Sequence, residues 1–243
     1  MLQVCLNGAR NRTECAHLPV TPQELAEAAR EAVDAGAQDI HLHPKNHDGE
    51  DTLEATHVDA AVAAVRAAVP AVPIGVTTGA WTMPDAHQRA ALVRSWTVLP
   101  DHASVNWHEV GATTVAGTLL ERGIGIEAGI YSGTQAARRF LAWPQAHRVL
   151  RILAEVTDTD PQTAPDVAAC LLNELSGANV PILLHGEETA AWTILHTSAT
   201  RGLDSRIGLE DVLQLPDGTP ATSNAGLIRA AHTVIQQAFQ TLI

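Results

Sequence analysis

The chain has 243 residues, of which 46% are hydrophobic and 17% charged, a composition typical of a globular protein with one large domain or two small ones. It carries 15 basic and 27 acidic residues, a formal net charge of −12, and Lys45 is its single lysine. Without a basic stripe we expect no nucleic-acid partner, and without a long apolar run we expect no membrane span. The cysteines are odd in number and widely spaced, which favours a reducing compartment, so the cytoplasm is the expected location.

Strand-like and helix-like segments alternate along the whole chain. The first strand-like segment, 2–8, leads through a loop to Thr21, Pro22 and Glu24, which form the start signal of a helix that ends at Gly36. Further strands are expected at 40–44, 72–78, 103–107, 124–127, 148–156, 180–185 and 205–209. Further helices are expected at 57–69, 85–98, 112–122, 134–143, 164–175, 187–201 and 224–242.

This alternation predicts the fold class. Strand–helix units at a spacing of about 30 residues, in a chain of this length, are typical of a TIM (β/α)8 barrel, an α/β fold. Connections are short, so we expect residues 1–243 to form a single catalytic domain. A doubly wound open sheet is the alternative, but no glycine-rich dinucleotide fingerprint follows the first strand.

Two histidines stand two residues apart in the second predicted strand. His41 and His43 alternate with the apolar residues Ile40 and Leu42. Residues i and i+2 of a strand share a face, so both imidazoles are predicted to point the same way and could bind one metal ion. Zinc is the first expectation, with other divalent metals possible. The pair alone also fits buried histidines that bond backbone carbonyls.

Polar residues stand at the ends of all the predicted strands, where TIM barrels carry their catalytic groups. They are Asn7, His41/His43, Thr77/Thr78, Asn106, Glu127, Glu155, His185 and Glu210/Asp211. We therefore expect one polar pocket at that end of the barrel. The expected substrate-binding residues are Thr77, Thr78, Gly79, Asn106, Glu127 and His185.

The run at 206–211, Arg-Ile-Gly-Leu-Glu-Asp, is the sharpest motif. Arg206, Gly208 and Glu210 would share one face of the last strand, and Asp211 would open the next loop. If this strand closes the barrel, Glu210 converges with the histidine pair on a metal ion. Two histidines and a carboxylate leave an open coordination position, which is typical of catalytic sites. Taken alone, the run also fits a surface Arg–Asp pair beside a strand-end carboxylate.

A series of short motifs runs through the chain in a recognisable order. They are Asn7-Gly8-Ala9, Leu18-Pro19-Val20-Thr21-Pro22, His41-Leu42-His43-Pro44, Asp48-Gly49, Thr77-Thr78-Gly79, Ser104-Val105-Asn106, the 206–211 run and Ser223-Asn224-Ala225. In these motifs the chain resembles the β-keto acid cleavage enzymes, the family typified by 3-keto-5-aminohexanoate cleavage enzyme. The resemblance covers nearly the whole chain, and its most specific part is the 206–211 run combined with the histidine pair.

The resemblance implies a zinc-dependent TIM barrel that splits a β-keto acid and hands an acyl group to CoA. Acetyl-CoA would be the cosubstrate, and acetoacetate would leave as the other product. The family's metal ligands carry over onto His41, His43 and Glu210, and its acid/base pair onto Arg206 and Asp211. Its substrate-holding residues carry over onto Thr77, Gly79, Asn106 and Glu14, of which we count Glu14 with the catalytic group.

The chain departs from the family pattern in three places near the expected site. The stretch Glu14-Cys15-Ala16-His17 lacks the proline usual before the Leu-Pro-Val segment. Lys45 stands where many members have an arginine, and it offers a point charge instead of a planar fork. Around the seventh strand a glycine/arginine turn is replaced by His185-Gly186-Glu187-Glu188. These departures bear on substrate choice and CoA contacts, not on the metal ligands.

Two other functions remain open from the residues alone. A metal-dependent hydrolase or aldolase of the same fold would use the same ligands without CoA. A catalytically inactive barrel that binds a small molecule belongs to another class, and turnover of any β-keto acid would exclude it. The alanine-rich helices 26–33 and 60–69 favour a homo-oligomer, a dimer or tetramer.

Overall fold

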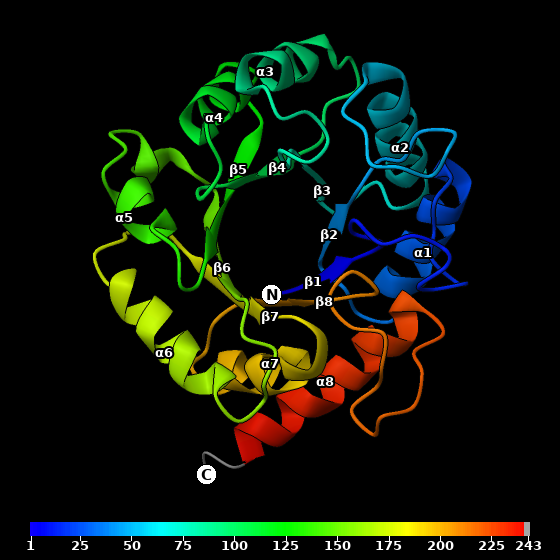
Figure 1. Ribbon diagram of the computed structural model, residues 1–243. Coiled ribbons are helices and arrows are strands. Elements are labelled where there is room, and N and C mark those ends of the chain that lie inside the picture. The colour runs from blue at the N-terminus through cyan, green and yellow to red at the C-terminus, as the bar shows by residue number, and fades with distance from the viewer. Residues whose placement is uncertain (241–243) are drawn as a thin grey trace.

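The computed structural model describes residues 1–240 and has the expected barrel architecture. Parallel strands run around it in the order β7-β6-β5-β4-β3-β2-β1-β8. The ends of this sheet meet, because Leu183 of β7 forms a parallel bridge with Asp204, just before β8. Figure 1 looks along the barrel and shows the strands as a ring with the helices around it. The fold is a TIM (β/α)8 barrel, as the alternation predicted.

The strands and helices have the following bounds. The strands are β1 (Leu2–Cys5), β2 (Asp39–Leu42), β3 (Ile74–Thr77), β4 (His102–Asn106), β5 (Gly125–Tyr131), β6 (Arg151–Val156), β7 (Ile182–Gly186) and β8 (Ser205–Ile207). The helices are α1 (Pro22–Asp34), α2 (Ala55–Ala68), α3 (Ala86–Ser95), α4 (Ala112–Glu121), α5 (Ala136–Leu141), α6 (Ala164–Glu174), α7 (Ala191–Thr200) and α8 (Asn224–Gln240), with 3-10 turns η1 (Ala146–Arg148) and η2 (Glu188–Ala190). Positions 241 and 242 of the last expected helix lie outside the described residues.

The local signals at the helix ends act as expected. Thr21 accepts a hydrogen bond from the Glu24 backbone and Glu24 bonds back, which completes a capping box at the start of α1. Gly36 follows the end of α1 with φ +111°, a conformation that favours glycine. Within residues 1–240, each helix is too short or too polar to cross a membrane.

Most strand boundaries differ from the expectation, and those of β1, β2, β5 and β8 move residues of the site. β1 ends at Cys5, before Asn7, and β2 ends at Leu42, so the prediction that His43 lies on the same strand as His41 was wrong.

β5 continues to Tyr131, so Glu127 is its third residue, and the prediction that Glu127 ends a strand was wrong. β8 ends at Ile207, two residues early, so the prediction that Gly208 and Glu210 share its face was also wrong.

Close contact with the neighbouring strand explains the early end of β8. Gly208 lies so near β1 that a Cβ atom there would stand 1.9 Å from the Cys5 carbonyl oxygen. The chain turns at this point, and the backbone N–H groups of Asp211 and Val212 both donate to the Gly208 carbonyl. Glu210 therefore reaches the barrel from a turn.

The apolar core lies between the strands and the helices, not along the barrel axis. Outward-facing strand residues such as Val4, Ile40 and Val76 are fully buried and belong to one hydrophobic cluster with helix residues such as Leu25 and Val62. Burial of this layer supplies the main favourable free energy of folding. The inside of the barrel is left for polar side chains.

Five of these inward residues, Gln3, Asp39, His102, Glu127 and Arg151, form what we call the interior ion cluster. Arg151 donates to Glu127 at 2.7 Å and to Asp39 at 2.8 Å, and Gln3 donates to both carboxylates at 2.9 Å. His102 Nε2 lies 3.0 Å from Asp39. Burial alone would lower the pKa of His102, but the Glu127 and Asp39 carboxylates raise it to about 9. A protonated His102 balances the charges of the cluster.

We expect the contribution of His102 to stability to depend on pH. Its pKa in the folded protein, about 9, lies above the ordinary value of 6.5, so its contribution is fully present below the unfolded value and is lost as pH rises through the folded one. His102→Gln should therefore lose more unfolding free energy near about pH 6 than near about pH 10. Urea unfolding of both proteins at the two pH values measures this. An equal loss at both would contradict a charged His102.

Candidate metal centre and active site

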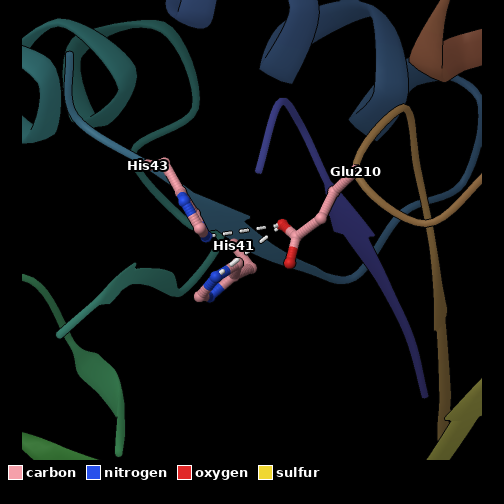
Figure 2. A group of neighbouring side chains, drawn as sticks. All are labelled: His41, His43 and Glu210. Atoms are coloured by element: carbon pink, nitrogen blue, oxygen red, sulfur yellow. Dashed lines mark ion pairs between the residues drawn. The ribbon is translucent and has the colours of Figure 1, made fainter. Parts of the chain in front are cut away.

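Three side chains converge at the C-terminal end of the barrel. His41 Nε2 and His43 Nε2 each lie 3.8 Å from Glu210 Oε2, and the ligand atoms of all three residues lie within 4.8 Å of one another. Figure 2 shows both imidazoles and the carboxylate pointing to one common place. The structure thus brings together the three expected metal ligands.

The donor set and its spacing fit a divalent metal. Glu210 Oε2 is buried and has no hydrogen-bond partner, which a bound cation would supply. Zn–N and Zn–O bonds of about 2.0–2.2 Å place tetrahedral ligand atoms roughly 3.4 Å apart, close to the 3.8 Å separations here. Burial lowers the pKa of His41 to about 4, so its imidazole is neutral, as metal ligation requires.

Strand β2 and the segment after it hold the two histidines. His41 lies on β2 between the buried residues Ile40 and Leu42, which pack outward, so its ring faces the barrel interior. His43 follows the strand and is fixed by Asn7, which accepts from the His43 backbone N–H and donates to its carbonyl, both at 2.9 Å. Asn7, expected at a strand end, therefore serves as a clamp on the backbone.

Glu210 is held over the end of β1 by the loop that follows this strand. Gly8 has φ +58°, and a Cβ atom there would stand 2.4 Å from Glu210 Cγ, so only glycine fits. Arg10 donates to the Glu210 carbonyl at 3.1 Å and pairs with Glu188. The turn that carries Glu210 is therefore fixed to the first strand although the two are far apart in sequence.

Arg206 joins the metal-ligand candidate to its neighbour Asp211. Its guanidinium, 5% exposed, donates to Glu210 Oε1 at 2.6 Å and twice to Asp211 Oδ1, at 2.8 and 3.1 Å. The other oxygen of Asp211, Oδ2, is buried without a partner. The expected Arg–Asp pair is thus present, with one carboxylate oxygen fixed and one available.

The two adjacent carboxylates differ in their electrostatics. Burial alone would raise the pKa of Glu210, but Arg206 and His41 hold it well below its usual range. Burial raises the pKa of Asp211 to about 7, with Arg206 opposing this and Glu210 adding to it. Glu210 therefore stays ionised as a ligand must, while Asp211 has a pKa in the range typical of general acid–base groups.

A cavity of about 350 Å³ opens beside these residues. It is lined by Ala9, Arg10, Glu14, His43, Trp81, Tyr131, Glu155, Glu187, Glu188, Arg206, Glu210 and Asp211. Glu14 is held at its rim by the backbone and side chain of Asn11, at 3.0 and 2.8 Å. The volume of the cavity is in the range of small-molecule binding sites.

The other expected substrate-binding residues are buried and are not among the residues that line this cavity. Thr78 donates to the Ser104 carbonyl, Thr77 accepts from the Gly79 backbone, and Asn106 donates to Glu109. Gly79 lies under the Trp81 ring, where a Cβ atom would stand 2.0 Å from the ring. His185, 1% exposed, lies between Asp211 and Glu155, at 3.6 and 3.7 Å. Glu127 is deeper still, fully buried in the interior ion cluster.

Sequence reasoning missed several side chains that matter at this pocket. Tyr131 lies at the true end of β5, which the misplaced strand boundary concealed. Asp51 contacts His43 from the loop after β2, and Glu187 faces the pocket from the loop before η2. Only Glu187 had a signal, since its segment departs from the family pattern.

The fold and the site define a TIM barrel with a candidate two-histidine, one-carboxylate metal centre. The sequence model of the beta-keto acid cleavage enzyme family matches residues 1–242. The chain belongs to this family.

Solved structures show the same fold at low sequence identity. ObcA in a ternary complex with a C4-CoA adduct and oxalate has a TM-score of 0.71 and 16% identity, over 91% of this chain and 64% of that one. ObcA in a binary complex with oxaloacetate has a TM-score of 0.68 and 16% identity, over 89% of this chain and 63% of that one. The 3-dehydroquinate dehydratase from Geobacillus kaustophilus HTA426 has a TM-score of 0.62 and 12% identity, over 99% of this chain and 91% of that one. This chain thus spans slightly less than two thirds of ObcA.

We expect purified protein to contain about one divalent metal ion per chain, zinc in the first instance. The His41→Ala/His43→Ala double variant should lose it, because two of three ligand atoms are gone. Elemental analysis of both proteins is the measurement, with the remote surface variant His147→Ala as control. Full metal occupancy in the double variant would remove His41 and His43 from the centre.

Proposed function

We propose that this protein is a metal-dependent β-keto acid cleavage enzyme that uses acetyl-CoA. The β-keto acid and acetyl-CoA would give acetoacetate and a new acyl-CoA. Family membership supports the β-keto acid, and the single observation that carries the chemistry is the Arg206–Asp211 pair beside the triad of His41, His43 and Glu210. ObcA, a similar fold, binds a C4-CoA adduct in its solved structure.

The proposed role of Asp211 is to take a proton from the carbon between the two carbonyl groups. Its Oδ1 is fixed by Arg206, whereas Oδ2 is buried and without a partner, and Asp211 is one of the residues that line the cavity. A fixed carboxylate with one free oxygen is well suited to proton transfer. Arg206 would keep that oxygen oriented, because a guanidinium binds a carboxylate in a defined plane.

His41, His43 and Glu210 would hold the metal ion. When bound, the metal would act as a Lewis acid toward the keto oxygen and carboxylate of the substrate. Asn106 and the Thr77–Gly79 turn are proposed as substrate-binding residues, although in this structure they bond to Glu109 and within the turn and do not line the cavity. Glu14 at the rim is the proposed third catalytic residue, near the place where a second substrate would enter.

We expect three variants to separate the base from the ligand. Asp211→Asn should keep the metal and lose about 10²–10⁴-fold in kcat, because the proton acceptor is gone. Glu210→Gln should bind the metal more weakly and lose activity for that reason. Arg206→Lys should keep the metal but turn over slowly, because an ammonium cannot hold the carboxylates as a fork does.

Metal content measured beside kcat for each variant is the test. Glu174→Gln, an exposed change on α6, is the control. If Asp211→Asn loses the metal, or turns over like wild type, the assigned roles are wrong.

The CoA requirement separates this proposal from its closest alternative. β-Keto acid cleavage should depend on acetyl-CoA and should produce acetoacetate in equal amount. Cleavage at the same rate without acetyl-CoA would instead support the hydrolase or aldolase. Absence of turnover on every β-keto acid, with metal bound, would support the binding barrel.

The side of the pocket away from the triad is rich in carboxylates. Glu155 is buried, and burial raises its pKa well above the usual range. Burial also raises the pKa of Glu187, which lines the same cavity. Neither carboxylate has a lysine or arginine within ion-pair distance among the described residues. Because burial already disfavours a negative charge on these two groups, it would also disfavour a second ionised carboxylate on the substrate, and among residues 1–240 no unpaired cation there offsets this cost.

We therefore expect β-keto acids with a neutral or cationic tail to be better substrates than dicarboxylates such as oxaloacetate. The expected difference in kcat/KM is at least about tenfold, because an ionised carboxylate buried without a cationic partner is costly. Glu187→Lys, which places a cation on the cavity wall, should narrow the difference, and the remote change Glu174→Lys should leave it unchanged. A wild-type preference for oxaloacetate would contradict this account of the pocket.

The homo-oligomer, as a dimer or tetramer, and the cytoplasmic location belong to the proposal as well. They rest on the alanine-rich helices and on the unpaired cysteines of the sequence. Residues 1–243 are proposed to act as a single catalytic domain.

A further inference from the structure

Asp51 is a buried carboxylate that contacts three different side chains beside the candidate metal centre. Its side chain is 5% exposed. Oδ2 lies 2.8 Å from His43 Nδ1 and accepts from Trp81 Nε1, also at 2.8 Å. Oδ1 lies 2.5 Å from Lys45 Nζ. A buried carboxylate with this many donors has a fixed position.

The contact with Asp51 determines which nitrogen of His43 faces the triad. A carboxylate accepts hydrogen bonds, so His43 Nδ1 carries the proton and donates a hydrogen bond to Asp51. The lone pair is then on Nε2, which lies 3.8 Å from Glu210 Oε2. An acceptor behind a histidine ligand fixes its tautomer and makes the coordinating nitrogen more basic.

His41 has no equivalent contact. Its Nδ1 is 3.8 Å from Glu127 Oε2, beyond hydrogen-bond distance, and is without a partner. Glu127 is instead engaged by Gln3 and Arg151 in the interior ion cluster. Of the two histidines, His43 is therefore the one that the protein orients before metal arrives.

Lys45 connects Asp51 to the loop that supports Glu210. Its ammonium, on a side chain 1% exposed, also donates to the carbonyls of Gly8 and Arg10, at 2.7 and 3.0 Å. Gly8 and Arg10 are the residues against which Glu210 is held. The compact ammonium can contact three oxygens around it, which a planar guanidinium could not do in the same space.

Trp81 extends the contact to the pocket wall. Its ring stacks on His43 with a centroid distance of 5.8 Å and an interplanar angle of 21°. Trp81 is 49% exposed and lines the cavity. The bond from its indole N–H to Asp51 holds the ring in this place.

We propose that Asp51 is the positioning residue of the metal centre. It fixes His43 in the Nδ1–H tautomer with Nε2 toward the metal, and it links both ligand-bearing segments through Lys45. This inference rests on the proposed metal centre, but not on the identity of the substrate or on CoA.

The test is the zinc affinity of metal-free protein, measured by competition with a chromogenic chelator. Asp51→Ala should weaken it about 10–100-fold, the usual effect of losing a ligand's outer partner. Asp48→Asn, an exposed change in the same loop, should leave it unchanged. Trp81→Phe should also leave it nearly unchanged, because the His43–Asp51 bond remains.

A second readout follows the tautomer directly. In nitrogen-detected NMR of metal-free protein, His43 should be protonated on Nδ1 in wild type and should become a mixture of tautomers in Asp51→Ala. The double variant Lys45→Met/Asp51→Ala should bind zinc as weakly as Asp51→Ala. Wild-type zinc affinity in the double variant would show that an unpaired Lys45, and not the missing Asp51 carboxylate, had weakened zinc binding in Asp51→Ala. This result would overturn the proposal.

The outcomes separate this inference from the metal centre itself. If wild type binds no zinc that depends on His41 and His43, the metal centre fails. If wild type binds zinc there and Asp51→Ala binds it equally well, only the role of Asp51 fails. Should Asp51→Ala not fold, as judged by circular dichroism, Asp51→Asn takes its place. The amide introduced by Asp51→Asn cannot accept from His43, Trp81 and Lys45 together, so weaker zinc binding is again expected, and wild-type affinity would overturn the proposal.

Discussion

The buried guanidinium of Arg206 is the interaction on which the site depends. A charge removed from water must be neutralised where it lies, and Arg206 achieves this with Glu210 and Asp211. One planar group thus sets the geometry of a ligand candidate and of the proposed base together. Neither carboxylate can move without leaving the guanidinium partly unpaired, which in a buried site is costly.

A second ionic layer lies deeper in the barrel and supports the first. In the interior ion cluster, Arg151 and His102 offset Asp39 and Glu127, so that the barrel encloses charge without a net excess. Glu127 also approaches His41 from this side, at 3.8 Å. Such an interior contributes specificity more than stability, and the free energy of folding comes from the apolar layer between strands and helices.

The sequence was sufficient to predict the barrel and the convergence of His41, His43 and Glu210, for physical reasons that also explain the errors. His41 faces the barrel interior because it alternates with the outward-facing Ile40 and Leu42 on β2. His43 lies just past the end of β2 and reaches the same place through its bonds to Asn7. Glu210 was expected on a strand face, yet the close packing of Gly208 against β1 turns the chain first. The end of β5 was placed too early because Gly129 interrupts the strand-like pattern after Glu127, whereas the turn signal Ser132-Gly133 marks where the strand ends.

Asp51 and Trp81 mark where sequence reasoning ends. Both lie outside regular strands and helices, and no periodicity or capping signal governs their direction. Asp51 faces His43 because Lys45 bridges to it across a single β-bridge, and Trp81 joins them from the loop after β3. Their positions follow from contacts between loops, which become defined only when the barrel has already placed the strand ends.

The charges of the pocket wall suggest that a bound metal ion would be needed for substrate binding as well as for the reaction itself. The cavity wall holds two guanidinium groups and a larger number of carboxylates, Glu14, Glu155, Glu187, Glu188, Glu210 and Asp211. Both guanidinium groups are already paired, Arg10 with Glu188 and Arg206 with Glu210 and Asp211. A β-keto acid is itself an anion, and this wall offers it no unpaired cation. A divalent cation on the triad would supply the missing positive charge at the place where the substrate carboxylate is proposed to bind. The proposed reaction therefore needs the metal first as a counter-charge and then as a Lewis acid, which explains how an acidic pocket can serve an anionic substrate.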